Sequence, residues 1–481
     1  MAEFLDAGDF EIEHCRLLTS EGSRFDLDVR SIAEIQIFED IQSNSVAGYI
    51  ALFDTVALAE IAPLIGQEYL ELILTTPSLT DSADKINFKE NVLHINKITT
   101  RTSIGNTGAL TVLQFTTSEI IHNQRTRISR SMTGTCSDIV ENILVNDLNC
   151  KKDLYIEKSV GVKKYIIPNI KPFSFIKNIT PHAFSVENKS PSFVFFENRR
   201  GYHFRSIESL YSLGPAFTYS DGDSIPFPSM PKLTKEVMRS KLLNSMSRVI
   251  DYKIYESQDS LINSAVGAFN SHLIVHDITN KSHNTYDYNY FKDRKDEKHI
   301  NYYNGGNDYP VFNDVVITSD GKTISDFSGV TFLSSTALKD DKDSHFTKSD
   351  SISNFDPVET ENWLQRRRSI LANIERSNVI EIQVFGNTWL AAGDIVNLFL
   401  TKRIAIHGND TVDKFFKGAF LVKKLSHSFK MSTGKHTMLM ELCKDSTSQT
   451  FENVTVHEEP KPINVGNRIT QFYNRGGGIR R

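Results

Sequence analysis

Residues 46–53 read VAGYIALF, and this short stretch decides what kind of structure to expect. It is too short for a buried helix and has the composition of a strand. Side chains alternate along a strand, so two sets face opposite sides: Val46, Ile50 and Leu52 against Tyr49, Ala51 and Phe53. Both sides are apolar, although a sheet in a lone globular domain commonly keeps one side wet. We therefore expect something to cover the second side.

The composition is ordinary for a soluble protein that buries several cores. The chain has 481 residues, 39% hydrophobic and 23% charged, and its length suggests about three domains. No run approaches the ~18 apolar residues of a membrane helix, and the acids in Met1–Phe10 argue against a signal peptide. The scattered cysteines predict reduced thiols and neither a disulfide scaffold nor a zinc site: Cys15, Cys136, Cys150 and Cys443.

The net charge of −5 argues against a protein that clamps nucleic acid along its whole surface. It says little about a protein that only lets nucleic acid pass.

Residues 1–117 are expected to form six short strands, which suggest a small barrel or sandwich. The expected strands are Phe10–Leu17, Ile32–Phe38, Val46–Phe53, Tyr69–Thr75, Asn91–Thr99 and Leu110–Thr116. One short helix is expected at Ala57–Leu64.

In residues 118–215 the pattern changes to a mixture of helix and strand. Ser137 can cap one helix, and Pro172 suits the first turn of a second that would bury Phe173, Ile176 and Ile179. A hairpin across Asn198-Arg199-Arg200 is expected from Ser192–Glu197 and Gly201–Arg205. The proline-, glycine- and serine-rich stretch Gly214–Pro231 is expected to be a linker.

Strands resume after this linker. They are expected at Arg248–Tyr255, Ser271–Thr279, Val379–Phe385, Ile395–Leu400, Phe416–Ser426 and His436–Cys443, with a helix between the first two. Residues 292–350 are rich in Asp, Lys, Ser and Gly and are expected to form long loops. A later helix start is signalled by Asp356, Pro357 and Glu359, with a buried face of Trp363, Ile370 and Ile374.

A short internal echo links the two ends of the chain. Residues 34–38, EIQIF, resemble residues 381–385, EIQVF, and each is followed by a glycine-containing turn and an apolar strand. The echo is either chance or the trace of a duplication that would give two related β-domains.

Motifs of catalysis and metal binding are missing. The chain has no GxSxG, HExxH or GxxxxGK[ST]. Among His272, His276, Asp277 and His283, residues four apart on a strand would be ~13 Å apart, so we expect ordinary surface histidines. Glu197 and Glu208 are the acid pair to consider for glycoside hydrolysis, but no pattern brings them to the roughly 5–9 Å such pairs need.

Two basic segments remain. Arg366-Arg367-Arg368 lies on the expected helix, where a solvated face is favoured over a contact for an acidic neighbour. The tail Gly466–Arg481 contains three consecutive glycines and should not order by itself. Its side chains Phe472, Tyr473, Arg475, Arg480 and Arg481 are candidates for docking on a partner.

Several of these stretches, taken in order, resemble one family. They are residues 35–54 with IFEDI…GYIALFD, 65–68, 99–119, 167–175 with IPNIKPFSF, 193–211 with FVFFENRRGYHFRSIESLY, 386–396 with GNTWLAAGDIV and 418–429 with GAFLVKKLSHSF. The chain resembles the central baseplate hub proteins of T-even-type contractile-tailed bacteriophages, to which the hub part of type VI secretion spike proteins is related. Residues 292–350 and 450–481 show little of this resemblance.

The resemblance implies an α+β, mainly β fold with two tube-protein-like antiparallel β-barrels plus additional α+β domains. Residues 1–117 would be the first barrel and 118–215 an α+β domain. The second barrel would start at 216–291, carry a loop-rich insertion at 292–355, and end with the helix and strands of 356–446. Residues 447–481 would be an extended tail.

The resemblance further implies a non-enzymatic structural protein of the virion baseplate, without cofactors, assembled in the host cytoplasm. Such hubs are homotrimers that join the sixfold tail tube protein to the threefold central spike protein and contact other baseplate proteins. DNA would pass through the lumen without specific binding, and no stable membrane insertion is expected. Tyr49, Ala51 and Phe53 would lie at a subunit or barrel–barrel interface, and the C-terminal aromatic and arginine residues would contact the spike.

Two alternatives remain open. A tail-associated cell-wall hydrolase would use Glu197 and Glu208. A receptor-binding tail protein commonly carries repetitive fibrous segments, and no such period is found in the sequence.

Overall fold

The computed structural model describes residues 6–19, 21–54, 64–77, 85–104, 108–221, 242–277, 281–303, 308–335, 360–401 and 412–448. The chain divides into two units, residues 1–448 and 449–481, and every described residue belongs to the first. The expected helix at Ala57–Leu64, apart from Leu64, and nearly all of the expected tail lie outside the described residues.

The N-terminal strands form an antiparallel set, here called the first β-unit. Its strands are β1 (Glu11–Leu18), β2 (Arg24–Asp26), β3 (Ile32–Asp40), β4 (Ala47–Asp54), β5 (Tyr69–Thr75), β6 (Ile86–Asn87), β7 (Leu93–Ile104) and β8 (Gly108–Thr117), with a short 3-10 turn, η1 (Val29–Ser31). The six expected strands are confirmed. They pair in the order β3-β4-β8-β7-β5-β1-β2, with β6 beside β5.

One face of the first β-unit is its core. Ile35, Ile50 and Leu113 are aligned across β3, β4 and β8 and are fully buried. Gly48 is required in the middle of β4, because an added Cβ would lie 2.2 Å from the carbonyl oxygen of Gln36 and 2.6 Å from the ring of Phe115. The glycine in GYIALFD therefore lets β3 and the core approach β4.

The two sides of β4 differ in burial. The inward set is buried as expected: Val46, Ile50 and Leu52. On the other side Ala51 is buried, Tyr49 is half-buried and Phe53 is 44% exposed. The second side is therefore only partly covered within this chain.

Helices and short strands follow in the α+β segment. They are α2 (Ser118–Arg125), β9 (Ser131–Gly134), α3 (Cys136–Asn142), a π turn η3 (Ile143–Asp147), β10 (Asp153–Ile156), β11 (Lys163–Ile166), α4 (Pro172–Ile179), a 3-10 turn η4 (Thr180–His182), β12 (Phe193–Asn198), β13 (Gly201–Ser206) and α5 (Ile207–Tyr211). The expected hairpin is confirmed as β12–β13, and β10 joins it in parallel.

The helix starts in this segment were partly predictable. Pro172 begins α4, and Phe173, Ile176 and Ile179 are buried, as expected. The expectation that Ser137 caps a helix is wrong. Thr135 caps α3 in a capping box with Asp138, because its side chain reaches the third amide of the helix, and Ser137 lies inside the helix.

The remaining long strands form a second β-unit. They are β14 (Pro215–Ser220), β15 (Val249–Ser257), β20 (Asn378–Phe385), β21 (Ile395–Thr401), β22 (Val412–Lys430) and β23 (Lys435–Lys444), paired in the order β15-β20-β23-β22-β21-β14. All expected strands of this set are confirmed. The expected linker Gly214–Pro231 is wrong at its start, because residues 215–220 pair in parallel with β21 and bury Tyr219; residues 222–231 lie outside the described residues.

The stretch between β15 and β20 holds a separate sheet of β16 (Asn270–Asp277), β17 (Ser282–Asn289) and β19 (Val330–Ser335). Short elements surround it: α7 (Ser260–Ala265), α8 (Tyr290–Asp293), η5 (Arg294–Asp296), α9 (Ile300–Tyr303), β18 (Tyr309–Pro310), η6 (Ile324–Asp326) and η7 (Thr360–Asn362). The expectation of long loops is therefore wrong where β19 and these short elements lie, whereas residues 311–323 are turns and irregular chain as expected. Aromatic residues explain the difference, since Phe269, Tyr290 and Phe312 form a small core there.

The last helix, α10 (Leu364–Arg376), buries Ile370 and Ile374 as expected. Trp363 stands at its N-cap, half-buried, instead of within the helix. The expected start signals Asp356, Pro357 and Glu359 lie outside the described residues. After β23 the chain adds β24 (Ser446–Thr447), which pairs with β18, so the first residue of the expected tail is part of the fold.

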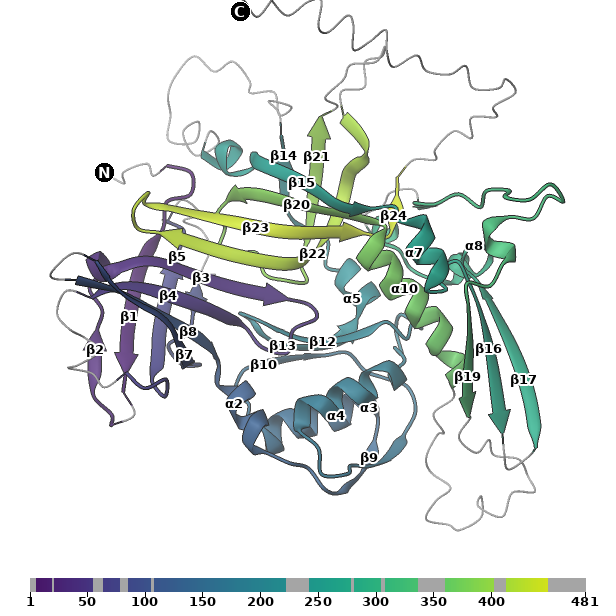
Figure 1. Ribbon diagram of the computed structural model, residues 1–481, viewed down its shortest axis with the longest axis horizontal. Coiled ribbons are helices and arrows are strands. Elements are labelled where there is room, and N and C mark those ends of the chain that lie inside the picture. The colour runs from purple at the N-terminus through teal and green to yellow at the C-terminus, as the bar shows by residue number, and fades with distance from the viewer. Residues whose placement is uncertain are drawn as a thin grey trace, which may run out of the picture. The chain divides into compact units, whose positions relative to one another are not determined.

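Among the described strands, one strand pairing joins the two β-units. Strand β3 lies antiparallel to β22 from Glu34 opposite Lys430 to Asp40 opposite Lys424, and Figure 1 shows the yellow hairpin β22–β23 alongside the purple β3. The result is one 14-stranded sheet whose path ends at β15 and β2. The mainly β, α+β class is confirmed. The described strands form no closed barrel, because β3 pairs with the other unit instead of closing its own.

Candidate functional site

The candidate site is the exposed face of the joined sheet. One row of directly paired positions crosses six strands: Gln114, Tyr49, Gln36, Ser428, Thr437 and Phe385. Neighbouring positions on these strands, such as Ile37, Met438 and Val384, point the other way and are buried. The sheet therefore separates an apolar core from a largely polar outer wall.

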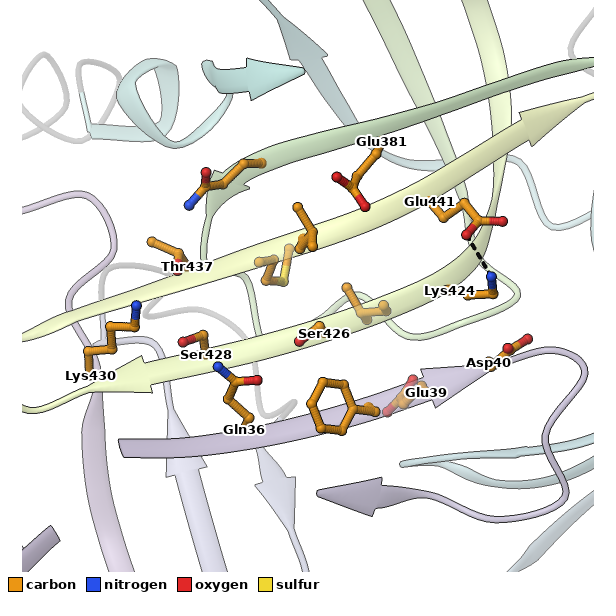
Figure 2. A pocket seen from close by; sticks show the side chains of 15 residues that line it. Gln36, Glu39, Asp40, Glu381, Lys424, Ser426, Ser428, Lys430, Thr437 and Glu441 are labelled. Carbon is orange, nitrogen blue, oxygen red and sulfur yellow. Dashed lines mark hydrogen bonds and ion pairs between the residues drawn. The ribbon is translucent and has the colours of Figure 1, made fainter. Parts of the chain in front are cut away.

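A groove of about 540 Å³ runs over this wall (Figure 2). Three carboxylates on its exposed side come from three strands: Asp40 of β3, Glu381 of β20 and Glu441 of β23. Two lysines of β22 face them, and Lys424 Nζ is 2.7 Å from Glu441 Oε2. Glu381 stands directly opposite Glu441 on one side and opposite Lys253 of β15 on the other. Lys423 also binds Glu441, at 2.8 Å, so acidic and basic side chains alternate across the wall.

Glu34 connects the two β-units on this exposed face. Its carboxylate accepts hydrogen bonds from Gln36 Nε2 at 2.8 Å, Tyr49 Oη at 3.3 Å and Ser428 Oγ at 3.0 Å. The three donors belong to β3, β4 and β22. Burial and the neighbouring Glu34 charge raise the pKa of Tyr49 to about 12, so its hydroxyl remains a donor at neutral pH.

On the buried face of β3, Glu39 bonds this strand to two other segments of the chain. It accepts hydrogen bonds from the backbone amides of Arg199 at 3.0 Å and Ala392 at 2.8 Å. Burial raises the pKa of Glu39, and the nearby Arg199 guanidinium opposes the rise. The side-chain amide of Asn198 donates to the backbone carbonyl of Ala392 at 2.9 Å, so the β12–β13 turn is bonded to the connection between β20 and β21.

This junction explains two of the quoted motifs. The turn FFENRRGY supplies Arg200, whose guanidinium contacts both oxygens of Asp394 at 2.6 and 2.8 Å. It also donates to the carbonyl of Trp389 at 2.6 Å. Asp394 and Trp389 belong to GNTWLAAGDIV, so these motifs are two halves of one contact.

A buried charge cluster holds the α+β segment against the first β-unit. Lys152 Nζ lies 2.5 Å from both Glu119 and Glu197, and the three side chains are 6%, 6% and 1% exposed. Glu197 also accepts from the backbone amide of Val46 at 3.1 Å and the hydroxyl of Thr117 at 2.6 Å. Burial raises the pKa of Glu197, while Lys152 opposes that rise.

The two acids considered for hydrolysis, Glu197 and Glu208, hold neighbouring segments of the fold together. Glu208 is buried and accepts hydrogen bonds from the hydroxyls of Ser190, at 2.8 Å, and Ser192. Glu197 belongs to the separate Lys152 cluster. Neither carboxylate lines the groove, so neither is placed to meet a polysaccharide there.

The three arginines of α10 are not a solvated face, so that preferred interpretation is wrong. Arg366 is 3.3 Å from Glu297, and Arg367 donates to the carbonyls of Pro191 and Phe193 at 2.8 and 2.6 Å. Arg368 donates to the carbonyl of Val266 at 2.9 Å. They bind α10 to neighbouring segments because unpaired carbonyls there need donors.

The remaining expected residues are placed as follows. His272 pairs with Asp287 at 2.5 Å, and His276 faces His283 across the strands. Within the described ranges no group of three or more His, Cys, Asp or Glu side chains is arranged to hold a metal ion. The tail candidates lie outside the described residues: Phe472, Tyr473, Arg475, Arg480 and Arg481.

None of the described helices has the length and apolar character needed to cross a bilayer.

The most informative groups on this face, Glu34 and Glu381, were missed from the sequence. Both begin the EIQ[IV]F echo, and their strands flank the same hairpin, since β3 pairs with β22 and β20 with β23. In both copies the Glu and Gln face outward and the aliphatic residues inward. The signal was therefore present in the repeated polar–apolar alternation, although the partner strands differ: β3 pairs next with β4, and β20 with β15.

Comparison of the chain with known protein families finds no family model that matches it. The chain is 25% identical over 182 residues to a probable baseplate hub protein of Vibrio phage KVP40, which is 37% of this chain and 42% of that protein. The chain thus spans less than half of the curated relative that it matches.

Two solved structures to which the chain is similar share little sequence identity with it. The tail protein of Neisseria meningitidis MC58 is 10% identical, with a TM-score of 0.48 over 91% of this chain and 97% of that one. The 43 kDa tail protein of prophage MuSo2 from Shewanella oneidensis is 9% identical, with a TM-score of 0.47 over 90% and 98%. The resemblance of this sequence to phage baseplate hub proteins is confirmed by the KVP40 match.

Proposed function

We propose that this chain is a structural baseplate hub of a contractile phage tail, and that its exposed sheet face lines a conduit. The observation that carries the proposal is the joined sheet, which is buried on one face and carries on the other a groove lined by more carboxylates than lysines. The sequence similarity to a probable baseplate hub protein supports the same role.

The conduit would be closed by a homotrimer. The sheet path ends at β15, where Ile250 and Ile254 are 46% and 43% exposed. An apolar sheet edge invites pairing with another chain, and a second copy of this chain would cover it. We assign Phe53 and the neighbouring Ala51 to the subunit or barrel–barrel interface, since Phe53 is the least covered part of β4. Tyr49, which was expected there too, would lie where this interface meets the wall, because its hydroxyl is bonded to Glu34 of β3.

Passage of DNA through such a conduit requires a wall that does not hold phosphate. In this proposal Asp40 and Glu381 repel a polyanion, whereas Glu441 and the two lysines bonded to it, Lys423 and Lys424, offset one another. In this proposal the hub joins the sixfold tail tube to the threefold central spike and touches other baseplate proteins. Its tail residues contact the spike: Phe472, Tyr473, Arg475, Arg480 and Arg481.

The molar mass of the purified chain in solution tests the assembly. A monomer has 54.5 kDa, and the proposal expects three times that mass from light scattering. Ile254→Asp should shift the protein toward monomer, whereas Leu261→Asp, at an exposed position of α7, should leave the mass unchanged. A wild-type monomer at all concentrations, or equal behaviour of the two variants, would overturn the trimer.

Binding of a short DNA duplex tests the wall. We expect no retention by the wild-type protein at low salt, where phosphate contacts are strongest. The double variant Asp40→Lys/Glu381→Lys should bind the duplex, with affinity that falls steeply as salt rises. Tight binding by the wild type at low salt would refute the low-friction wall.

The proposal is non-enzymatic because the acid pair considered for hydrolysis is buried in two separate networks. Turbidity of a peptidoglycan suspension checks this directly. Clearing by the wild-type protein that is lost in Glu208→Gln would overturn the non-enzymatic assignment.

A further inference from the structure

The strands β16 and β17 bring two histidines face to face at the end of the hairpin. His276 and His283 occupy directly paired positions in the antiparallel register, and both are exposed. Their Nδ1 atoms are 3.3 Å apart. His272, on the same side of β16, is bonded to Asp287 at 2.5 Å instead of to either of these rings.

We propose that His276 and His283 form a cross-strand chelate for a divalent late first-row transition ion such as Zn²⁺, Ni²⁺ or Cu²⁺. Two metal–nitrogen bonds of about 2.0–2.1 Å at the tetrahedral angle separate their nitrogens by about 3.3 Å. The observed separation is 3.3 Å, so the ion fits without movement of either strand. Imidazole suits all three ions.

The two rings are close but not stacked. Their centroids are 4.8 Å apart and their planes are inclined by 58°. The same separation of the Nδ1 atoms also allows a hydrogen bond between the rings, so a bound ion would take the place of the shared proton.

Two protein ligands leave the other coordination positions to water. Ser335 of β19 is paired in register with His276 and stands beside the pair. His272 is not a third ligand, since it lies four residues along the strand, about 13 Å away by the strand rise. The proposed site is therefore a two-histidine clamp between β16 and β17, the antiparallel strands that lie side by side in Figure 1.

The test uses the full-length chain freed of metal and titrated calorimetrically with ZnCl₂, NiCl₂ and CuCl₂ separately. We expect one ion per chain at this site, with Cu²⁺ bound more tightly than Zn²⁺ or Ni²⁺. His276→Gln and His283→Gln should each weaken binding by about tenfold or more, while the matched control His272→Gln should stay within about twofold.

A second readout follows the strands themselves. Hydrogen exchange of the peptides that contain residues 270–277 and 282–289 should slow when saturating Zn²⁺ is added to the wild type and should not change in His276→Gln. Absence of binding in the wild type, equal affinity in His276→Gln and His272→Gln, or exchange that ignores the metal would each overturn the proposal. None of these results bears on the hub assignment, which is tested by mass and DNA binding.

Discussion

Removal of the buried lysine at the junction should be the most damaging single charge change in the described structure. Lys152 Nζ lies 2.5 Å from both Glu119 and Glu197, and all three side chains are 6% exposed or less. The substitution Lys152→Met keeps the length of the side chain but leaves two carboxylates buried beside each other. Breaking a buried pair on one side costs about 3–5 kcal/mol, so we expect a loss of that size in the free energy of unfolding.

The loss should depend on pH with a defined sign. Without Lys152, burial and the nearby Glu119 charge raise the folded-state pKa of Glu197 above its unfolded value. Stability relative to the wild type is then lost as pH rises through the raised pKa and regained on acidification, because one carboxyl takes up a proton. The deficit of Lys152→Met should therefore be smaller at pH 5 than at pH 7.5.

Two measurements check this prediction. Urea unfolding followed by circular dichroism gives the stability difference at both pH values. Hydrogen exchange of peptides near Val46 reports the junction itself, because the Val46 amide donates to Glu197 at 3.1 Å. Lys151→Met, at an exposed neighbouring position, is the matched control. Equal stability of the two variants, or a deficit that grows toward pH 5, would show that the cluster does not hold the junction.

Three further predictions concern single positions. Glu34→Ala removes the acceptor of three hydrogen bonds and should lower the free energy of unfolding by about 1–3 kcal/mol, measured with urea. The substitution Glu11→Ala, at an exposed position, should lower it by less than about 0.5 kcal/mol. Gly48→Ala should sharply reduce the yield of folded protein in a solubility assay, since its Cβ meets the backbone of β3. An added Cβ at Gly434 meets open space, so Gly434→Ala should lower the free energy of unfolding by only about 1 kcal/mol, the cost of its φ of +62°. Asp445 raises the pKa of buried His299 to about 9, so the stabilising pair is complete below the unfolded pKa of about 6.5. Melting temperature should fall as pH rises from about 6.5 toward 9, and His299→Gln should flatten that slope; an unchanged slope would count against the pair.

Local patterns in the sequence predicted most elements. Alternation of apolar residues located β3, β4, β20 and β23, and Pro172 located the start of α4. These signals work because the side chains that decide them are neighbours in the chain. They misled where polar composition was read as loop, as in residues 215–220, because a parallel partner strand supplied the hydrogen bonds.

The long-range contacts of charged side chains were much less predictable, including the pairing that forms the candidate site. Glu197 was noted as a possible acid, and its engagement by Lys152 depends on a contact between residues 45 positions apart. The arginines of α10 were expected in water, yet Arg367 reaches carbonyls 174 and 176 positions away. Charge by itself does not reveal a buried partner that the chain supplies from elsewhere.

The sequence by itself determined which residues of each strand turn inward, because that choice follows from alternation and the transfer of apolar side chains out of water. It also determined the outward Glu and Gln of both EIQ[IV]F copies. Only the tertiary structure decided that β3 pairs with β22, where Glu34 and Ser428 meet from positions 394 apart. The physical reason is that backbone donors and acceptors at a strand edge are alike in every strand, so the partner is selected by long-range packing and not by the local residues.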